Sequence, residues 1–305
     1  MNNEPVSHTV YSNPHMLRIL ATIFAALFGL AFGSFLNVCL SRWPAGESIV
    51  HPRSHCRSCG RTLAWWENVP LLSWIALRGR CRTCRTRISL RYPLVEGAVG
   101  ALWALLVWYS NEDVFVPDIP AQLRALNIVA TLASLGFFWL LVALAALDAE
   151  HLWLPDFLTW PGIVAGIALK VAFEQFGYHP DSEPHPFRVL LQFTVLTAAA
   201  AAIILVIRLV YWLIRRREGL GLGDAKLMAL LAAWLGLPLA LLALFLGVVL
   251  GAAVAIAFLL TPASRRSERA WRAAKLPFGT FLCIGGMVSA LWGQQILDAY
   301  FRLYS

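Results

Sequence analysis

Long apolar stretches recur along almost the whole chain, separated by short polar segments. A membrane-spanning helix needs about 20 apolar residues, and eight stretches approach or exceed that length. Only helices and closed barrels satisfy the backbone in lipid, and these stretches are too long for barrel strands. The pattern therefore predicts an all-α, polytopic integral membrane protein with about eight transmembrane helices. They cover residues 17–40, 93–109, 125–147, 157–175, 188–214, 225–237, 239–261 and 277–300.

Two of these stretches need comment. The sixth is short, and Gly236 and Pro238 mark the break that separates it from the seventh. The first lacks a basic flank and a small-residue cleavage site, so we expect a retained helix rather than a cleaved signal peptide.

Overall composition supports membrane placement. Of the 305 residues, 59% are hydrophobic and 14% charged, and the mean hydropathy is +0.66. A soluble protein of this size is less apolar.

Basic residues gather in three segments, 41–92, 215–226 and 262–276, which hold 19 of the 25 lysines and arginines. The opposite loops are acidic. Since basic loops stay on the cytoplasmic side, the pattern predicts that these segments face the cytoplasm and both termini face outward. This asymmetry and contact with anionic headgroups explain the net charge of +8. Nucleic acid is therefore not an expected partner.

The chain divides into four expected parts. Residues 1–16 form a polar N-terminal tail, 17–40 the first transmembrane helix, 41–92 a cytoplasmic loop and 93–305 the remaining transmembrane domain, which holds the acidic residues discussed below.

The loop contains two CxxC pairs separated by 21 residues. Two such turns can close a tetrahedral thiolate shell around Zn²⁺, which would supply folding free energy to a loop too small for a large core. Disulfides or idle thiols are the alternatives, and a reducing cytoplasm disfavours the disulfides. The other two cysteines, Cys39 and Cys283, lie in apolar stretches as small buried residues. The expected ligands of a structural zinc are Cys56, Cys59, Cys81 and Cys84.

Two aspartates stand at membrane boundaries. Asp148 ends a long apolar helix, and Asp224 follows three alternating glycines, Gly219, Gly221 and Gly223. Glycines there disfavour regular helix and would let an extended peptide approach. Two neighbouring carboxylates can share one proton, which suits water-activated peptide hydrolysis by one base and one acid.

Structural roles compete with this interpretation. Asp156 is expected to cap the helix that follows it, Asp224 could cap its own helix, and Asp148 could pair with an arginine. Lys226 could hold its charge near the acid pair, reach a substrate acid, or snorkel to the interface. Glu150 and His151 are expected to be solvated.

The order of short motifs along the chain resembles that of the prepilin peptidases, also called type IV leader peptidases, of pilus and type II secretion systems. The motifs span most of the chain. They are 33–38 with Arg42 and Pro44, 70–74, the two CxxC pairs, 91–96, 148–158, 221–226 and 277–279.

The resemblance implies an intramembrane aspartyl endopeptidase of the bacterial inner membrane, with Asp148 and Asp224 catalytic. Its motifs also give supporting or substrate-binding roles to Glu96, Gly221, Gly223 and Lys226. The expected reaction is cleavage after a glycine, on the cytoplasmic face, of the basic leader of prepilins or pseudopilins. Members with a large cysteine loop are similar in methylating the new N-terminus with S-adenosylmethionine.

The chain departs from the family pattern at few positions. Glu150 stands where many relatives have aspartate, and Leu220 and Leu222 lie among the glycines. No glycine-rich dinucleotide fingerprint follows a predicted strand, so the methyl-transfer prediction rests on the resemblance. Alternatively, the loop could be only a surface that holds the substrate, stabilised by zinc. A proton-coupled transporter and a non-catalytic assembly factor remain the other possible functions.

Overall fold

In the computed structural model, residues 14–110, 120–176, 185–216, 221–260 and 276–303 are described, and their regular structure is entirely helical. Within these ranges, extended pairing is limited to two isolated bridges, His55 with Thr62 and Arg80 with Arg87. The helices are α1 (Pro14–Arg42), η1 (Trp43–Ala45), η2 (Trp65–Asn68), α2 (Leu72–Ala76), α3 (Arg91–Tyr109), α4 (Ala121–His151), α5 (Asp156–Phe176), α6 (Pro186–Arg215), α7 (Leu222–Leu235), α8 (Leu237–Leu260) and α11 (Phe278–Arg302).

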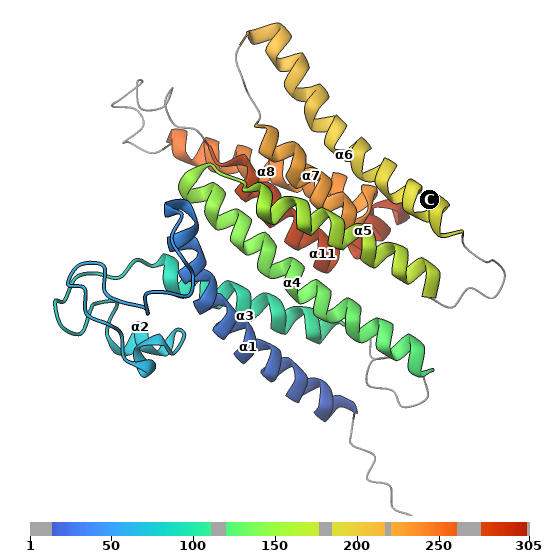
Figure 1. The fold of residues 1–305 in the computed structure, drawn as a ribbon. Coiled ribbons are helices and arrows are strands. Elements are labelled where there is room, and N and C mark those ends of the chain that lie inside the picture. The colour runs from blue at the N-terminus through green and yellow to red at the C-terminus, as the bar shows by residue number, and fades with distance from the viewer. Residues whose placement is uncertain (1–13, 111–119, 177–184, 217–220, 261–275, 304–305) are drawn as a thin grey trace, which may run out of the picture.

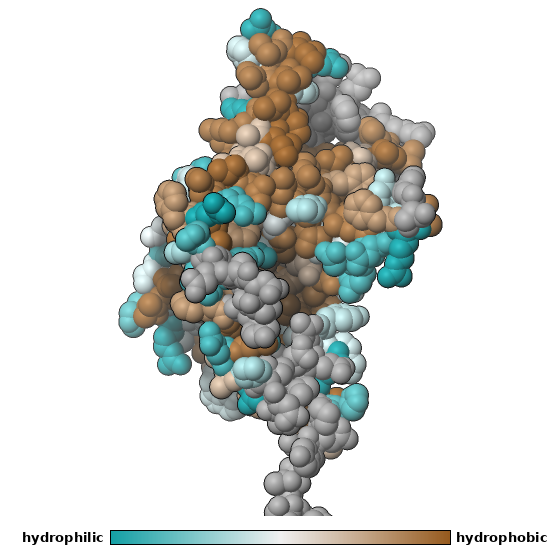
Figure 2. Space-filling view, turned by 90° about the vertical axis from the view of Figure 1, so that its right-hand side faces the viewer, coloured by the Kyte–Doolittle hydropathy of each residue, from teal (hydrophilic) through white to brown (hydrophobic). Residues whose placement is uncertain are grey.

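Seven of these helices, α1, α3, α4, α5, α6, α8 and α11, are long and apolar enough to cross a membrane. The all-α membrane class predicted from the sequence is confirmed. Figure 2 shows hydrophobic side chains over much of the surface on the side it presents, as expected for helices that face lipid.

The sixth predicted helix, α7, has a different place. Its 14 residues extend about 21 Å, which is less than the hydrocarbon thickness of about 30 Å. Helices α5, α6, α8 and α11 pack around it, and nearly all of its side chains are buried. It ends at Gly236, whose φ of 84° favours glycine. Because protein rather than lipid surrounds α7, it need not span the bilayer.

Close packing at glycines holds α1 against α3. A Cβ atom at Gly29 would lie 2.8 Å from the Cα of Gly100, and one at Gly33 would lie 2.7 Å from the Cα of Glu96. The missing side chains let the two backbones touch, as small residues do in membrane helix pairs. Helix α4 then packs against α3 on one side and α11 on the other, so it joins this pair to the rest of the bundle.

The first loop, residues 43–90, lies at the end of the bundle where α1 ends and α3 begins (Figure 1). We call this end the loop end. The end of α4 and the first turns of α5, α7 and α11 also lie there, whereas α1 begins and α11 finishes at the opposite end. Both ends of the described chain are therefore remote from the loop. Which side of the membrane each end faces stays a prediction.

Candidate functional site

Asp148 lies in the last turn of α4, and only 6% of its surface is exposed. Its Oδ2 accepts two hydrogen bonds from Thr280, one from the backbone N–H at 2.7 Å and one from the hydroxyl at 3.2 Å. Thr280 is in the first turn of α11, where backbone N–H groups lack helical partners and the helix dipole is positive. The aspartate thus caps a neighbouring helix, and within the described part of the chain it forms no ion pair with an arginine.

Asp224 is the third residue of α7 and is 8% exposed. Its Oδ2 accepts a hydrogen bond from the backbone N–H of Gly221 at 2.9 Å. A carboxylate at this position reaches back to the residue before the helix, as the acid of a capping box does. Asp224 therefore helps to start α7, although from inside the helix rather than from its N-cap. Gly223 also lies within the helix, contrary to the expected non-helical glycine segment; Gly219 lies outside the described residues.

Leu154, in the connection between α4 and α5, lies next to a glycine beside each of the two aspartates. A Cβ atom at Gly223 would lie 3.0 Å from its Cδ1, and one at Gly279 would lie 3.1 Å from the same atom. The Gly279 Cβ would also lie 2.9 Å from the Cγ of Asp148. The first turns of α7 and α11 therefore meet at the end of α4.

This convergence brings the two carboxylates into one site. Asp148 acts electrostatically on Asp224, and both act on the buried Cys283 in α11. Cys283 and Cys39 are fully buried, as the sequence predicted. The structure thus places two buried carboxylates, far apart in the chain, at the loop end of the bundle.

Two ion pairs lie near this site. Lys226 pairs with Asp156 between α7 and the first residue of α5. Glu150 is exposed, as predicted, and its Oε2 lies 2.6 Å from Arg91 Nη1. His151 lies beside it at 3.8 Å. The first pair joins α5 to α7, and the second joins the start of α3 to the end of α4.

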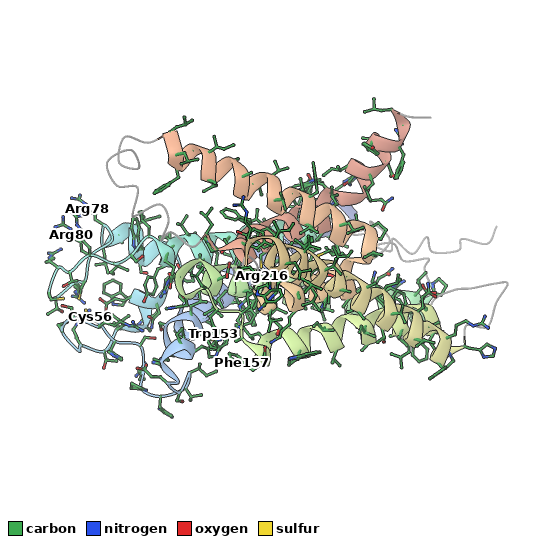
Figure 3. The ribbon with its side chains drawn as sticks, turned by 90° about the horizontal axis from the view of Figure 1, so that it is seen from above. Cys56, Arg78, Arg80, Trp153, Phe157 and Arg216 are labelled. Atoms are coloured by element: carbon green, nitrogen blue, oxygen red, sulfur yellow. The ribbon has the colours of Figure 1, made fainter. Side chains whose placement is uncertain are left out.

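Several residues at this site carried no clear sequence signal. Thr280 follows the motif 277–279, but nothing in the sequence showed that it would meet Asp148. Trp43 makes edge contacts with Trp139 and Phe157, and Phe157 also contacts Trp153. Figure 3 places Trp153 and Phe157 between the bundle and the loop. These aromatic residues suit the boundary between lipid and water.

Glu96 has a different setting from the acid pair. It is buried in α3, and its Oε2 accepts the backbone N–H of Leu71 at 2.8 Å. Ser34 and Asn37 of α1 also lie near its carboxyl group. Its partners identify Glu96 as the attachment point of the first loop on the membrane helices.

The four loop cysteines form a cluster. Their Sγ atoms all lie within 4.8 Å of one another, none is in a disulfide, and Cys56 and Cys84 are 3.7 Å apart. In a tetrahedral site with Zn–S bonds of about 2.3 Å, sulfur atoms are about 3.8 Å apart. The cluster therefore fits a metal of this geometry, and the structure contradicts the disulfide alternative, since all four cysteines are free.

Hydrogen bonds favour the thiolate form of two of these cysteines. The hydroxyl and backbone N–H of Thr86 lower the pKa of Cys84 to about 6. Backbone N–H groups of Cys84 and Thr83 lower the pKa of Cys81. Thiolates are the form that binds metal.

An ion pair between the partly exposed Arg61 and the buried Glu67 stabilises the same loop. The guanidinium of Arg61 donates two hydrogen bonds to Glu67, at 2.6 and 2.9 Å. Glu67 also accepts the backbone N–H of Ala64. The Arg61 side chain lowers the pKa of the Glu67 carboxyl. This bidentate pair fixes η2 against the first cysteine turn.

Fold and site together define a class: a polytopic helical membrane protein with two buried carboxylates at one end and a four-cysteine loop beside them. Two family models match the chain. The first, described as the bacterial peptidase A24 N-terminal domain, matches residues 27–110. The second, described as the type IV leader peptidase family, matches residues 135–256. The chain belongs to the type IV leader peptidase family.

Similar curated proteins carry the name prepilin leader peptidase/N-methyltransferase. One from Stutzerimonas stutzeri is 32% identical, over 95% of this chain and 96% of its own length. One from Burkholderia pseudomallei is 36% identical, over 88% and 85%. One from Myxococcus xanthus is 42% identical, over 79% and 64%. No solved structure gives a significant match to the chain.

Proposed function

We propose that this protein is a membrane-embedded aspartyl endopeptidase that removes the leader peptide of prepilins or pseudopilins. The observation that carries the proposal is the convergence of Asp148 and Asp224, both buried, at the loop end of the bundle. Family membership and the names of the relatives support the substrate class. From the family resemblance, we further propose that the cleaved peptide bond follows a glycine of the prepilin.

The hydrogen bonds favour different roles for the two acids. Hydrogen bonds donated to a carboxylate favour its ionised form. Asp148 accepts two from Thr280, whereas Asp224 accepts one from Gly221. We therefore assign the base to Asp148 and the proton donor to Asp224.

In the proposed reaction, Asp148 takes a proton from a water molecule, whose oxygen attacks the carbonyl carbon of the scissile bond. Asp224 gives its proton to the carbonyl oxygen. When the resulting tetrahedral diol collapses, one of its hydroxyl groups returns a proton to Asp224, the C–N bond breaks, and the leaving amine takes up the proton held by Asp148. Both Thr280 bonds fall on Oδ2 of Asp148, so Oδ1 is the oxygen that would face the water.

Replacing each aspartate by asparagine tests this proposal. Asp148→Asn and Asp224→Asn should each reduce the rate of prepilin cleavage by at least about a hundredfold, the usual contribution of acid–base catalysis. Asp298→Asn is the matched control, because this exposed residue is near the far end of α11. Full activity of either site variant, in protein that still inserts and melts normally, would falsify the assignment.

The orientation of the protein is a further part of the proposal. Residues 41–92 carry ten arginines, and basic loops stay on the cytoplasmic side. The loop end, with both carboxylates, would then face the cytoplasm, and the N-terminus would face outward from the bacterial inner membrane. Protease access to the loop in sealed inverted vesicles, but not in intact spheroplasts, would support this orientation.

We also propose that the protein methylates the amine exposed by cleavage, using S-adenosylmethionine. Support comes from the names of the relatives and from the resemblance. A prepilin incubated with purified protein and labelled S-adenosylmethionine should lose its leader and gain one labelled methyl group, both visible in the product mass.

Zinc is the metal we propose for the cysteine cluster. Cys56, Cys59, Cys81 and Cys84 would hold it, and their sulfur spacing fits its tetrahedral shell. The ion would contribute folding free energy to the loop rather than take part in peptide hydrolysis.

A further inference from the structure

Six large apolar side chains of the first loop are exposed, and three of them belong to η2 and α2, although the loop lies outside the seven membrane-length helices. Trp65 is 78% exposed, Leu72 66% and Ile75 63%. On the spanning helices such exposure needs no explanation, because lipid covers it. On a loop outside them, an exposed apolar patch indicates an interaction surface.

The attachment of α2 shows how deep this patch lies. The residue before α2, Leu71, donates its backbone N–H to Glu96. Glu96 is five residues inside α3, which places it about 7.5 Å along the axis from the first residue of that helix. Gly33, packed against Glu96, is nine residues before the end of α1, or about 13 Å along its axis. Helix α2 therefore begins beside the spanning helices rather than beyond their ends (Figure 1).

The side chains of α2 face two directions. Trp74 faces inward: a Cβ at Gly79 would lie 2.7 Å from its ring, and its Nε1 donates to the backbone oxygen of Ile88. Leu72 and Ile75 are three positions apart, so they share one face of the helix, and that face is exposed. Leu94 of α3, the spanning helix on which Glu96 holds the start of α2, is also largely exposed.

Positive charge lies beside this apolar face. Arg78 and Arg80 follow α2 almost directly, and both are exposed. Figure 3 shows them together on the loop. An apolar face, a tryptophan and adjacent arginines are the features of segments that lie in the bilayer interface and contact anionic headgroups.

We propose that α2 and Trp65 form an interfacial anchor, which inserts its apolar face into the leaflet at the loop end and places Arg78 and Arg80 against anionic phospholipid headgroups. The anchor would hold the four-cysteine cluster at a fixed height over the membrane. Its occupant is the bilayer itself, because α2 begins beside the spanning helices α1 and α3 rather than beyond their ends. This inference does not depend on the peptidase proposal.

Photo-crosslinking tests the anchor in the full chain. A benzophenone amino acid is placed at position 72 or 75, and at position 62 as a control, since Thr62 is exposed on the loop outside the patch. The protein is reconstituted alone in nanodiscs of phosphatidylglycerol or phosphatidylcholine. Positions 72 and 75 should give phospholipid adducts several times more abundant than position 62. Adducts with a second copy of the chain, or no excess over position 62, would overturn the proposal.

Amide hydrogen exchange separately tests the contact of Arg78 and Arg80 with anionic headgroups. The amides of residues 71–80 should be better protected in phosphatidylglycerol than in phosphatidylcholine. Replacing Arg78 or Arg80 by glutamine should reduce that difference by about fivefold each, as expected for one arginine at an anionic surface. Arg53→Gln is the matched control, because this exposed arginine lies away from α2 in the chain. Equal protection in both lipids, with normal melting and metal content, would contradict the headgroup contact.

Discussion

The backbone N–H of Thr280 donates a 2.7 Å hydrogen bond to Oδ2 of Asp148, across 132 positions of the chain. The Thr280 hydroxyl contacts the same oxygen and the backbone oxygen of Ala145. Asp148 is thereby fixed to the start of α11 as well as to its own helix. The orientation of one proposed catalytic carboxylate is therefore set by a helix remote in sequence.

Thr280 should act as a positioning residue. Thr280→Val removes the hydroxyl donor but keeps the backbone donor and the shape of the side chain. A hydrogen bond to a charged group contributes about 1.5–3 kcal/mol, so kcat for prepilin cleavage should fall about ten- to a hundredfold with little change in KM. Thr280→Ser, which keeps the hydroxyl, should retain most activity. Equal kcat values for the two variants would show that the hydroxyl has no part in positioning Asp148.

Gly279 should tolerate no side chain. In Gly279→Ala the new Cβ would lie 2.9 Å from the Cγ of Asp148, so the carboxylate must move. Misplacement of a catalytic group by about 1 Å can cost about a hundredfold in rate, and we expect a loss of that order in the cleavage assay. Gly136→Ala in α4 is the control, because a Cβ there meets nothing within 4 Å. Wild-type rates for Gly279→Ala would argue against the described geometry.

The cysteine cluster should hold one metal ion per chain. Cys84→Ser or Cys56→Ser removes a thiolate ligand, so purified protein should lose the equivalent of zinc that elemental analysis finds in the wild type. Cys39→Ala should keep it, since this cysteine is buried in α1 away from the cluster. Metal-free wild-type protein with a protected loop would contradict a structural metal.

The pair of Arg61 and Glu67 should stabilise the loop independently of the cysteines. Glu67→Gln weakens both hydrogen bonds to Arg61 and leaves its guanidinium without a carboxylate. Amides of residues 54–68 should then exchange faster, whereas those of α4 and α7 should be unchanged. Glu47→Gln provides the comparison, because Glu47 is exposed. A loop that exchanges equally in both variants would mean that the pair contributes nothing measurable.

The sequence predicted the spanning helices closely because their signal is local. Each span is a run of apolar residues of membrane length, and α3, for example, covers 91–109 against a predicted 93–109. The two cysteine turns were equally predictable, since CxxC spacing alone places two thiolates on one side of a turn. The end of α7 at Gly236 also followed from its glycine and the nearby proline.

Tertiary structure decided what those helices do. Apolar composition does not distinguish a helix that faces lipid from one enclosed by protein, so only packing showed that α7 is a short buried core helix. Residue types suggested Asp148 and Asp224 as an acid pair, but their convergence, and the contact of Asp148 with Thr280, depend on how α4, α7 and α11 cross. The chain therefore specifies its helices through local hydrophobicity, whereas the site arises from contacts between residues distant in sequence, which no local pattern records.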